Sequence, residues 1–357
     1  MNNYWSALAR SLKPYVPGEQ PKDRKYIKLN TNENPYGPSP LVLDAIKAEL
    51  DDSLRLYPDP DCSELVEAAA ERYGVGNDRV FVGNGSDEVL AFAFMAFFDP
   101  GRTIIFPNIT YSFYPVYASL FRLDYATAPL DDDFGIQTGQ LMKSCGGVVL
   151  ANPNAPTGRA LPLAEIRRII EGNPDTVVII DEAYAEFGGE SAIGLTDEYP
   201  NLLVVRTLSK SHSLAGMRVG MAFGDKELIS ALESVKNSFN SYTLDRLAIA
   251  AGTAALKDDA YYRQTIAKVI ATRERFTREL TSRGFLVTDS SANFVFASHQ
   301  DIYAEDIFNE LRKKGILVRY FKLPQIDNYL RISIGTDEDM DALISALDGI
   351  IESRSRP

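Results

Sequence analysis

Short, uninterrupted apolar runs recur between residues 78 and 224 and restrict the possible fold more than any other feature of this sequence. Helical stretches separate the runs, which are RVFV (79–82), TIIF (103–106), VVL (148–150), VVII (177–180), LLVV (202–205) and RVGMAFG (218–224). A strand with one face in water alternates apolar and polar residues, whereas a continuous apolar run suits a strand that is covered on both faces. We therefore expect an α/β domain with a parallel or mostly parallel sheet under helices.

The C-terminal part of the chain predicts a smaller α+β unit. A long helix is expected over about 258–283, followed by strands over 285–287 and 293–298 and by a helix that ends at Gly315. ILVRYF (316–321) and YLRISIG (329–335) predict further strands, and Thr336 begins a last helix. The first 40 residues are rich in Pro and Gly and show little periodicity. We expect an N-terminal arm over 1–40 that packs with the small domain, a large domain over 41–250 and the small domain over 251–357.

Composition argues against several classes of protein. The 357 residues are 45% hydrophobic and carry a net charge of −12, which disfavours a nucleic-acid partner. The longest apolar run, 89–98, is far shorter than the roughly 20 residues that cross a membrane, and no secretion signal begins the sequence, so we expect a cytoplasmic protein. The two cysteines, Cys62 and Cys145, predict packing residues rather than a disulfide or a metal site.

Polar residues follow the apolar runs, at the strand ends where open α/β sheets bind ligands. A Gly-rich turn with Ser86 and Asp87 precedes an apolar helix, and its N–H groups can hold a phosphate, although either residue could simply cap the helix. The residues after the next four runs are Tyr111, Asn152, Asp181 with Tyr184, and Ser209 with Lys210.

The last two of these strand ends suggest cofactor chemistry. Asp181 follows VVII, where a buried acid needs a cationic partner such as a protonated ring nitrogen. Lys210 lies between a hydrophobic strand and a turn that contains Arg218, where partial desolvation favours a neutral, nucleophilic amine. A single loop lysine is usually a surface residue, so the interpretation depends on all of the strand ends together.

Several motifs resemble a known enzyme family. DEAY (181–184), TLSKSHSLAGMRVG (207–220) and PNAPTG (153–158) resemble fold-type I aminotransferases, and LKPYVPGE (12–19) and KLNTNENPYGPSP (28–40) resemble histidinol-phosphate aminotransferases in particular. The resemblance covers essentially the whole chain. It implies a large, mostly parallel seven-stranded sheet domain with helices on both faces, which binds pyridoxal 5′-phosphate, and a smaller α+β domain. The implied reaction is ping-pong amino transfer between L-histidinol phosphate and 2-oxoglutarate, in histidine biosynthesis.

The resemblance also implies a role for each residue near the cofactor ring. Lys210 would hold the cofactor as a Schiff base and later move a proton between substrate and cofactor carbons. Asp181 would keep the ring nitrogen protonated, Tyr184 would donate to the ring hydroxyl, and Tyr111 would stack on the ring. Many relatives have Asn directly before P-T-G, where this chain has Ala155, so Tyr184 becomes the main donor to the ring oxygen unless Asn154 takes that role.

Phosphate and substrate groups complete the implied site. The cofactor phosphate would bind the N–H groups of Ser86 and Asp87, the Ser209 hydroxyl and the Arg218 guanidinium. Tyr57 would reach the phosphate of the neighbouring subunit, which implies a homodimer with shared active sites. One site must bind both a phosphate substrate and glutamate, and a guanidinium binds either oxyanion. Arg331 and Arg319 are the candidates for this role, with Tyr15 closing the pocket.

Other functions remain open at this stage. A phosphothreonine decarboxylase or an aromatic amino acid aminotransferase would share the fold. The type of reaction depends on which bond of the substrate carbon lies perpendicular to the cofactor ring, and the sequence does not determine that orientation. A non-catalytic transaminase-like protein would require loss of the lysine or the aspartate, and neither is lost. A hydrolase or an oxidoreductase finds little support, because the sequence has neither a G-x-S-x-G motif nor a G-x-G-x-x-G motif between a strand and a helix. His212 is expected to be a local packing or hydrogen-bonding residue.

Overall fold

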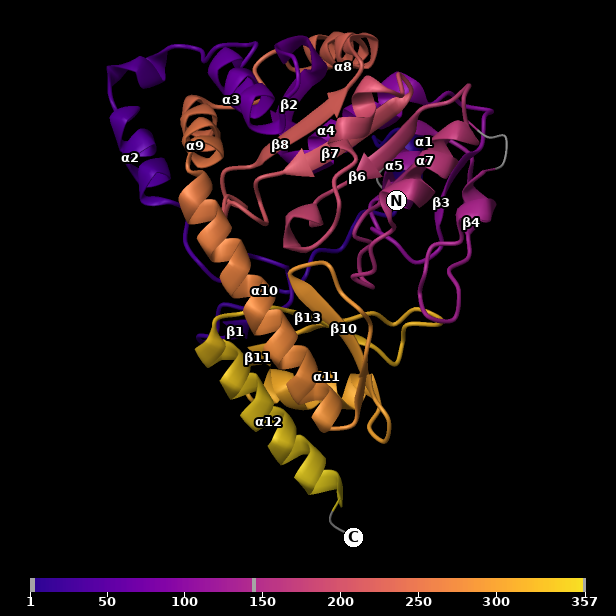
Figure 1. Ribbon diagram of the computed structural model, residues 1–357, viewed down its shortest axis with the longest axis vertical. Helices are drawn as coiled ribbons and strands as arrows, with labels where there is room; N and C mark the ends of the chain where they lie inside the picture. The colour runs from indigo at the N-terminus through magenta and orange to yellow at the C-terminus, as the bar shows by residue number, and fades with distance from the viewer. Residues whose placement is uncertain (1–3, 143–145, 356–357) are drawn as a thin grey trace.

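A seven-stranded sheet forms the centre of the larger part of the molecule. The computed structural model describes residues 4–142 and 146–355, and the sheet has the order β2-β8-β7-β6-β5-β3-β4 (Figure 1). Strand β8 is antiparallel to both of its neighbours, and every other neighbouring pair is parallel. The strands are β2 (Val80–Asn84), β3 (Ile104–Pro107), β4 (Tyr125–Ala128), β5 (Gly147–Ala151), β6 (Val178–Asp181), β7 (Leu202–Thr207) and β8 (Val219–Gly224). All six apolar runs form strands, which confirms the mostly parallel sheet.

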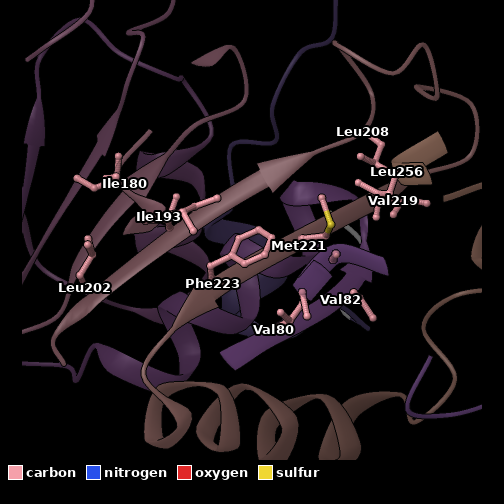
Figure 2. Packing of buried hydrophobic residues seen from close by; sticks show 14 of the residues in the cluster. Val80, Val82, Ile180, Ile193, Leu202, Leu208, Val219, Met221, Phe223 and Leu256 are labelled. Atoms are coloured by element: carbon pink, nitrogen blue, oxygen red, sulfur yellow. The ribbon is translucent and has the colours of Figure 1, made fainter. Parts of the chain in front are cut away.

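Helices cover both faces of this sheet, as the continuous apolar runs predicted. Within β6, Val178 and Ile180 belong to one buried cluster, and Ile179 between them belongs to another. Figure 2 shows the first cluster, in which Met221 and Phe223 of β8 lie near Val80 and Val82 of β2. The helices on that side are α2 (Pro40–Ala48), α3 (Ser63–Tyr73), α7 (Leu163–Glu171) and α9 (Arg246–Lys257), and those on the other side are α4 (Gly85–Phe97), α5 (Tyr114–Phe121) and α8 (Lys226–Phe239).

A smaller four-stranded antiparallel sheet, of order β12-β13-β10-β9, lies beyond the first sheet along the long axis (Figure 1). Its strands are β9 (Phe285–Val287), β10 (Phe294–His299), β12 (Arg319–Tyr320) and β13 (Leu330–Ser333), and its helices are α10 (Asp259–Ser282), α11 (Ala304–Lys313) and α12 (Asp337–Ser355). The run 316–321 divides between two sheets, because β11 (Ile316–Leu317) pairs with β1 (Ile27–Lys28) of the N-terminal segment instead. That pairing brings the segment around residue 28 next to the small sheet.

Short elements complete the described chain. They are α1 (Ala7–Ser11), α6 (Thr138–Leu141) and the 3-10 helices η1 (Asp52–Arg55), η2 (Asn77–Arg79), η3 (Ala185–Phe187) and η4 (Ile193–Asp197). In the described ranges, no helix is long and apolar enough to cross a membrane. Cys62 is buried in the core of the large sheet with a free thiol, as expected of a packing residue. Cys145 lies outside the described residues.

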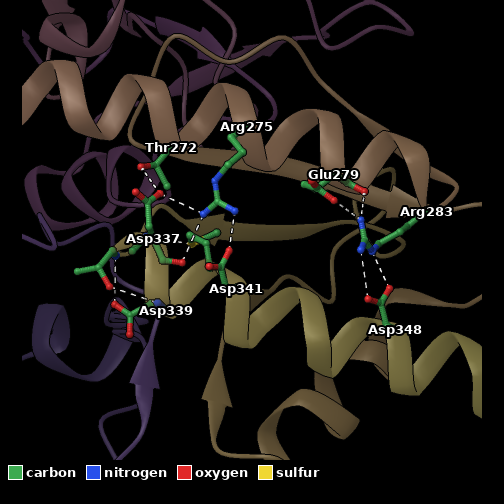
Figure 3. A network of polar contacts seen from close by, with 11 residues as sticks. Thr272, Arg275, Glu279, Arg283, Asp337, Asp339, Asp341 and Asp348 are labelled. Carbon is green, nitrogen blue, oxygen red and sulfur yellow. Dashed lines mark hydrogen bonds and ion pairs between the residues drawn. The ribbon is translucent and has the colours of Figure 1, made fainter.

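Ion pairs and apolar contacts fasten α12 to α10. Figure 3 shows Arg275 of α10 bound to Asp341 at 2.6 Å and to Asp337 at 3.0 Å, and Arg283 bound to Asp348 at 2.6 Å. These carboxylates are largely exposed, and exposed pairs contribute only about 0–1 kcal/mol each. Burial of a full-sized apolar side chain contributes about 1.5–3 kcal/mol. Phe276, Leu280 and Leu343 are fully buried in the hydrophobic cluster between these helices and the small sheet, and such apolar contacts therefore contribute most to holding α12 against α10.

Candidate active site

A cavity of about 210 Å³ lies beyond the carboxyl ends of the parallel strands. Residues from the large sheet, the small sheet and the N-terminal segment all line it. The structure brings together all of the expected site residues except Tyr57, and these lining residues are Tyr15, Ser86, Asp87, Tyr111, Asp181, Tyr184, Ser209, Lys210, Arg218, Arg319 and Arg331. Of the strand-end residues named from the sequence, Asn152 does not line the cavity, because its side-chain amide is bonded to the backbone of Leu161. The other strand-end residues do converge on it.

Asp181 is a buried carboxyl at the end of β6. It accepts a hydrogen bond from the Tyr114 hydroxyl at 2.9 Å and a longer one from the backbone N–H of Ala183 at 3.3 Å. Desolvation raises the pKa of Asp181 to about 6, and the Tyr114 hydrogen bond opposes that rise. In the described part of the chain, no cationic side chain forms an ion pair with Asp181. A cationic ring nitrogen would supply the missing partner.

Three consecutive residues of the N-terminal segment contact three candidate catalytic groups. The backbone carbonyl of Asn30 accepts a hydrogen bond from Arg331 Nη2 at 3.0 Å, and that of Thr31 accepts one from Lys210 Nζ at 3.3 Å. Asn32 Nδ2 donates to the Tyr184 hydroxyl at 3.0 Å. The Lys210 amine lies 5.9 Å from the centre of the Tyr184 ring. A segment far away in sequence therefore holds the lysine, the tyrosine and the arginine around one cavity.

The turn between β2 and α4 is shaped to receive an anion. The first N–H groups of a helix have no intrahelical partner, and those of Ser86 and Asp87 fall in the first turn of α4. Gly85 has φ of +83°, and a Cβ atom there would collide with the Arg218 guanidinium. A Cβ on Gly220 of β8 would collide with the backbone of Gly85 and Ser86. Glycine at both positions lets the guanidinium and the helix N-terminus share one site.

Asp87 links this turn to the aromatic wall of the cavity. Its carboxylate accepts from the Tyr111 hydroxyl at 2.7 Å and from Arg218 at 3.1 Å. Burial, followed by the Asp87 charge, raises the pKa of Tyr111, so its hydroxyl remains a donor. Tyr15 lies 6.3 Å from Tyr111, between ring centres, and stacks on Phe113 at 4.8 Å. The ring of Tyr111 is thus held in the wall by its hydroxyl and by its neighbours.

Two arginines from the small sheet face the same cavity. Arg319 and Arg331 are directly opposed in the β12–β13 pair, where like charges repel unless an anion lies between them. Desolvation lowers the pKa of Arg331, and the Arg319 charge lowers it further. The Nε atom of Arg331 is buried and has no partner among the described residues. The pair is therefore suited to bind a phosphate or a carboxylate.

Tyr57 lies outside the cavity. Its side chain is 79% exposed and stacks on Tyr242, with ring centres 4.6 Å apart. Its expected role concerns a neighbouring subunit, which this single chain does not test. His212 is buried, bonds to the Ser211 hydroxyl and stacks on Tyr262, in agreement with a packing role.

The loop after β5 leaves Ala155 at the cavity and keeps Asn154 away from it. Asn154 Oδ1 accepts from the Thr110 hydroxyl at 2.9 Å, while its Nδ2 donates to the Ile109 carbonyl at 2.9 Å and to the Thr157 hydroxyl at 3.2 Å. Both ends of the amide are therefore occupied. Ala155 is 5% exposed, lines the cavity and packs in the same cluster as Tyr184.

Sequence reasoning missed four residues of the site: Asn30, Thr31, Asn32 and Tyr114. The first three lie in the Pro- and Gly-rich N-terminal segment, where asparagine and threonine are typical turn residues. Tyr114 lies on α5, three residues after Tyr111, and its contact with Asp181 joins residues 67 positions apart. The motif 28–40 supported the family resemblance, but its residue types do not show which of them contact the site, and Tyr114 looks like an ordinary helix position.

Comparison with known proteins agrees with this geometry. Residues 24–347 match the family model described as aminotransferase class I and II. A histidinol-phosphate aminotransferase of Clostridium acetobutylicum is 57% identical over 97% of this chain and 99% of its own length. One of Aromatoleum aromaticum is 56% identical over 98% of this chain and its own full length. The crystal structure of the Sinorhizobium meliloti enzyme in complex with pyridoxal-5′-phosphate covers 99% of both chains, with 26% identity and a TM-score of 0.90.

The seven-stranded sheet with helices on both faces, the lysine and aspartate at adjacent strand ends, and the family match define the class: the chain is a class I and II aminotransferase of fold type I. The sequence is more than half identical to those of two histidinol-phosphate aminotransferases over nearly its full length, which identifies the family within this class. The chain belongs to the histidinol-phosphate aminotransferase family.

Proposed function

We propose that this protein is a pyridoxal-phosphate-dependent aminotransferase that exchanges the amino group between L-histidinol phosphate and 2-oxoglutarate, giving imidazole-acetol phosphate and L-glutamate. The observation that carries the proposal is one cavity that combines the Lys210 amine, the buried Asp181 carboxyl, Arg218 from the turn before β8, and two arginines from the small sheet. Relatives with the same named activity share more than half of the sequence. The reaction serves histidine biosynthesis.

The residues of the cavity fit pyridoxal phosphate. Asp181 has a raised pKa and lacks a cationic partner among the described residues, which is the environment that a protonated ring nitrogen would complete. Ser86, Asp87, Ser209 and Arg218 would hold the phosphate through backbone N–H groups, a hydroxyl and a guanidinium. When bound, the cofactor supplies an aldehyde that captures amines and a cationic ring that accepts electrons.

The protein's own groups control where protons lie. The Lys210 amine, held by the Thr31 carbonyl, would anchor the cofactor. Once released by the substrate amine, it would carry a proton from the substrate carbon to the cofactor carbon on the other side of the shared nitrogen. Asp181 would keep the ring nitrogen protonated. Tyr184 would donate a hydrogen bond to the ring oxygen, and Tyr111 would cover the ring and exclude water.

Arg319 and Arg331 would bind the part of the substrate that carries the oxyanion. Histidinol phosphate and glutamate share no common tail apart from a negatively charged group, and a guanidinium fork binds phosphate or carboxylate with two parallel hydrogen bonds. The buried Nε of Arg331 offers a donor that nothing else in the described chain uses. Tyr15 would close the cavity over the bound substrate.

The proposal includes a cytoplasmic homodimer that shares its active sites. Apolar side chains from α2 to residue 57 are exposed on this chain, among them those of Leu41, Leu54, Leu56 and Tyr57, and burial in a second subunit would remove them from water. Tyr57 would then reach the neighbouring cofactor phosphate. We also propose domain limits of 1–40 for the arm, 41–250 for the large domain and 251–357 for the small one.

A direct assay tests the substrate assignment. Purified, cofactor-loaded protein is incubated with L-histidinol phosphate and 2-oxoglutarate, and glutamate formation is followed by mass spectrometry. We expect glutamate with the wild type and none above background with Lys210→Ala. Faster glutamate formation from an aromatic amino acid, or release of CO₂ from phosphothreonine, would show that the substrate assignment is wrong.

A further inference from the structure

Asn32 makes four hydrogen bonds inside the protein, although it lies in the N-terminal segment. It is 1% exposed and has φ of +55°, a left-handed conformation that asparagine tolerates better than most residues. Its backbone N–H donates to the Ser333 hydroxyl at 2.9 Å, and its carbonyl accepts from Asn293 Nδ2 at 3.0 Å. Ser333 lies in β13 of the small sheet, and Asn293 directly precedes β10 of the same sheet. The backbone of Asn32 is therefore fixed on two sides.

The same contacts fix the direction of the side-chain amide. The Ser333 hydroxyl accepts the Asn32 N–H, and it donates its own proton to Asn32 Oδ1 at 2.9 Å. Nδ2 is then left to face Tyr184, to whose hydroxyl oxygen it donates at 3.0 Å. The reversed amide would leave the Ser333 proton without an acceptor and would draw the Tyr184 proton toward Asn32. The observed orientation gives an acceptor to the Ser333 proton and to one Nδ2 hydrogen of Asn32, and the contacts therefore favour it.

The hydroxyl oxygen of Tyr184 accepts this hydrogen bond from Asn32, so the hydroxyl's own proton points elsewhere. Tyr184 also lines the cavity. Ala155 lines the same cavity without offering a donor, and both ends of the Asn154 amide are occupied. The direction of one tyrosine proton thus depends on a residue 152 positions away in the sequence.

We propose that Asn32 is a positioning residue for the reaction: through Ser333 and Asn293 it is locked as a donor, and it thereby directs the Tyr184 proton into the cavity, toward the ring oxygen of the bound cofactor. This inference rests on the proposed function. It also links the small sheet, which carries the substrate-binding arginines, to the group that tunes the cofactor on the large sheet.

The pH dependence of the visible absorption band of the cofactor-loaded protein tests this role. A donor to the ring oxygen lowers the midpoint of that titration, so loss of the donor raises it. Asn32→Gly removes the amide and suits the positive φ, so both backbone contacts remain. Asn32→Ala removes the same amide but strains the backbone. We expect both variants to raise the midpoint equally, by about half a pH unit, as expected when one hydrogen bond is weakened.

A double variant separates action through Tyr184 from other effects. Tyr184→Phe should raise the midpoint more than Asn32→Gly does, and adding Asn32→Gly to Tyr184→Phe should change nothing further. The proposal is overturned by an unchanged midpoint in Asn32→Gly, by a shift in Asn32→Ala alone, or by an equal shift in the Tyr184→Phe background. Absence of any visible band in the wild type would instead refute the proposed function.

Discussion

Replacing Asp181 with asparagine should stabilise the cofactor-free protein while it damages the enzyme. The carboxyl is 4% exposed and its folded-state pKa is raised from 3.8 to about 6, chiefly by desolvation. Between these pH values the folded chain binds more protons than the unfolded chain, so stability falls as the pH rises from 3.8 to about 6. Above that range the loss is constant at about 3 kcal/mol. Asparagine has no charge to bury and retains an acceptor for Tyr114.

Urea unfolding of the cofactor-free proteins, at one protein concentration and several pH values, measures this effect. We expect Asp181→Asn to gain up to about 3 kcal/mol over the wild type at pH 8, and the gain to vanish near pH 4. Turnover of the loaded variant should fall by about 100-fold or more, because a neutral amide cannot hold the ring proton. A stability difference that is the same at pH 4 and pH 8 would refute the assignment of the raised pKa to Asp181.

Three other predictions concern the substrate, the cofactor oxygen and the dimer. Arg331→Lys should lower kcat/KM for histidinol phosphate and for glutamate alike, by about 10-fold or more, since a point charge cannot replace a bidentate contact. Stopped-flow measurements of the two half-reactions test this, and a loss confined to glutamate would contradict a shared anion site. Ala155→Asn should lower the pH midpoint of the visible band, because the new amide adds a donor that Asn154 cannot supply; a spectrophotometric titration in which the midpoint stays or rises would contradict this. Lys210→Ala and Tyr57→Ala should each lower activity when alone, and mixing the two proteins should restore up to about a quarter of the total wild-type activity if the sites are shared, because half of the dimers are then mixed and one of their two sites has both residues. No recovery after verified subunit exchange would argue against sharing.

Much of the large sheet could be predicted because a strand buried on both faces leaves an uninterrupted apolar run. Strand β4 was missed for the complementary reason: YATA (125–128) lies at the sheet edge, and three of its four residues are exposed. The strand-end residues Asp181 and Lys210 were found because the sheet itself determines where its carboxyl ends meet.

The contacts by which the N-terminal segment holds Lys210 and Arg331 could not be predicted in the same way. The Thr31 contact to Lys210 spans 179 positions and the Asn30 contact to Arg331 spans 301. These contacts depend on how the N-terminal segment crosses between the two sheets, and β1 pairing with β11 contributes to that path. Neither composition nor periodicity records such a path, so a Pro- and Gly-rich segment gives no sign that it holds catalytic groups.

The central claim, that Lys210 in this cavity is the covalent anchor of pyridoxal phosphate, can be tested by reductive trapping. The cofactor-loaded protein is treated with borohydride, which fixes an imine as a stable amine, and is then digested and sequenced by mass spectrometry. We predict that the pyridoxyl phosphate mass lies on Lys210, and that histidinol phosphate added before the reductant removes the label from it. A label on any other lysine, with Lys210 unmodified, would contradict the account.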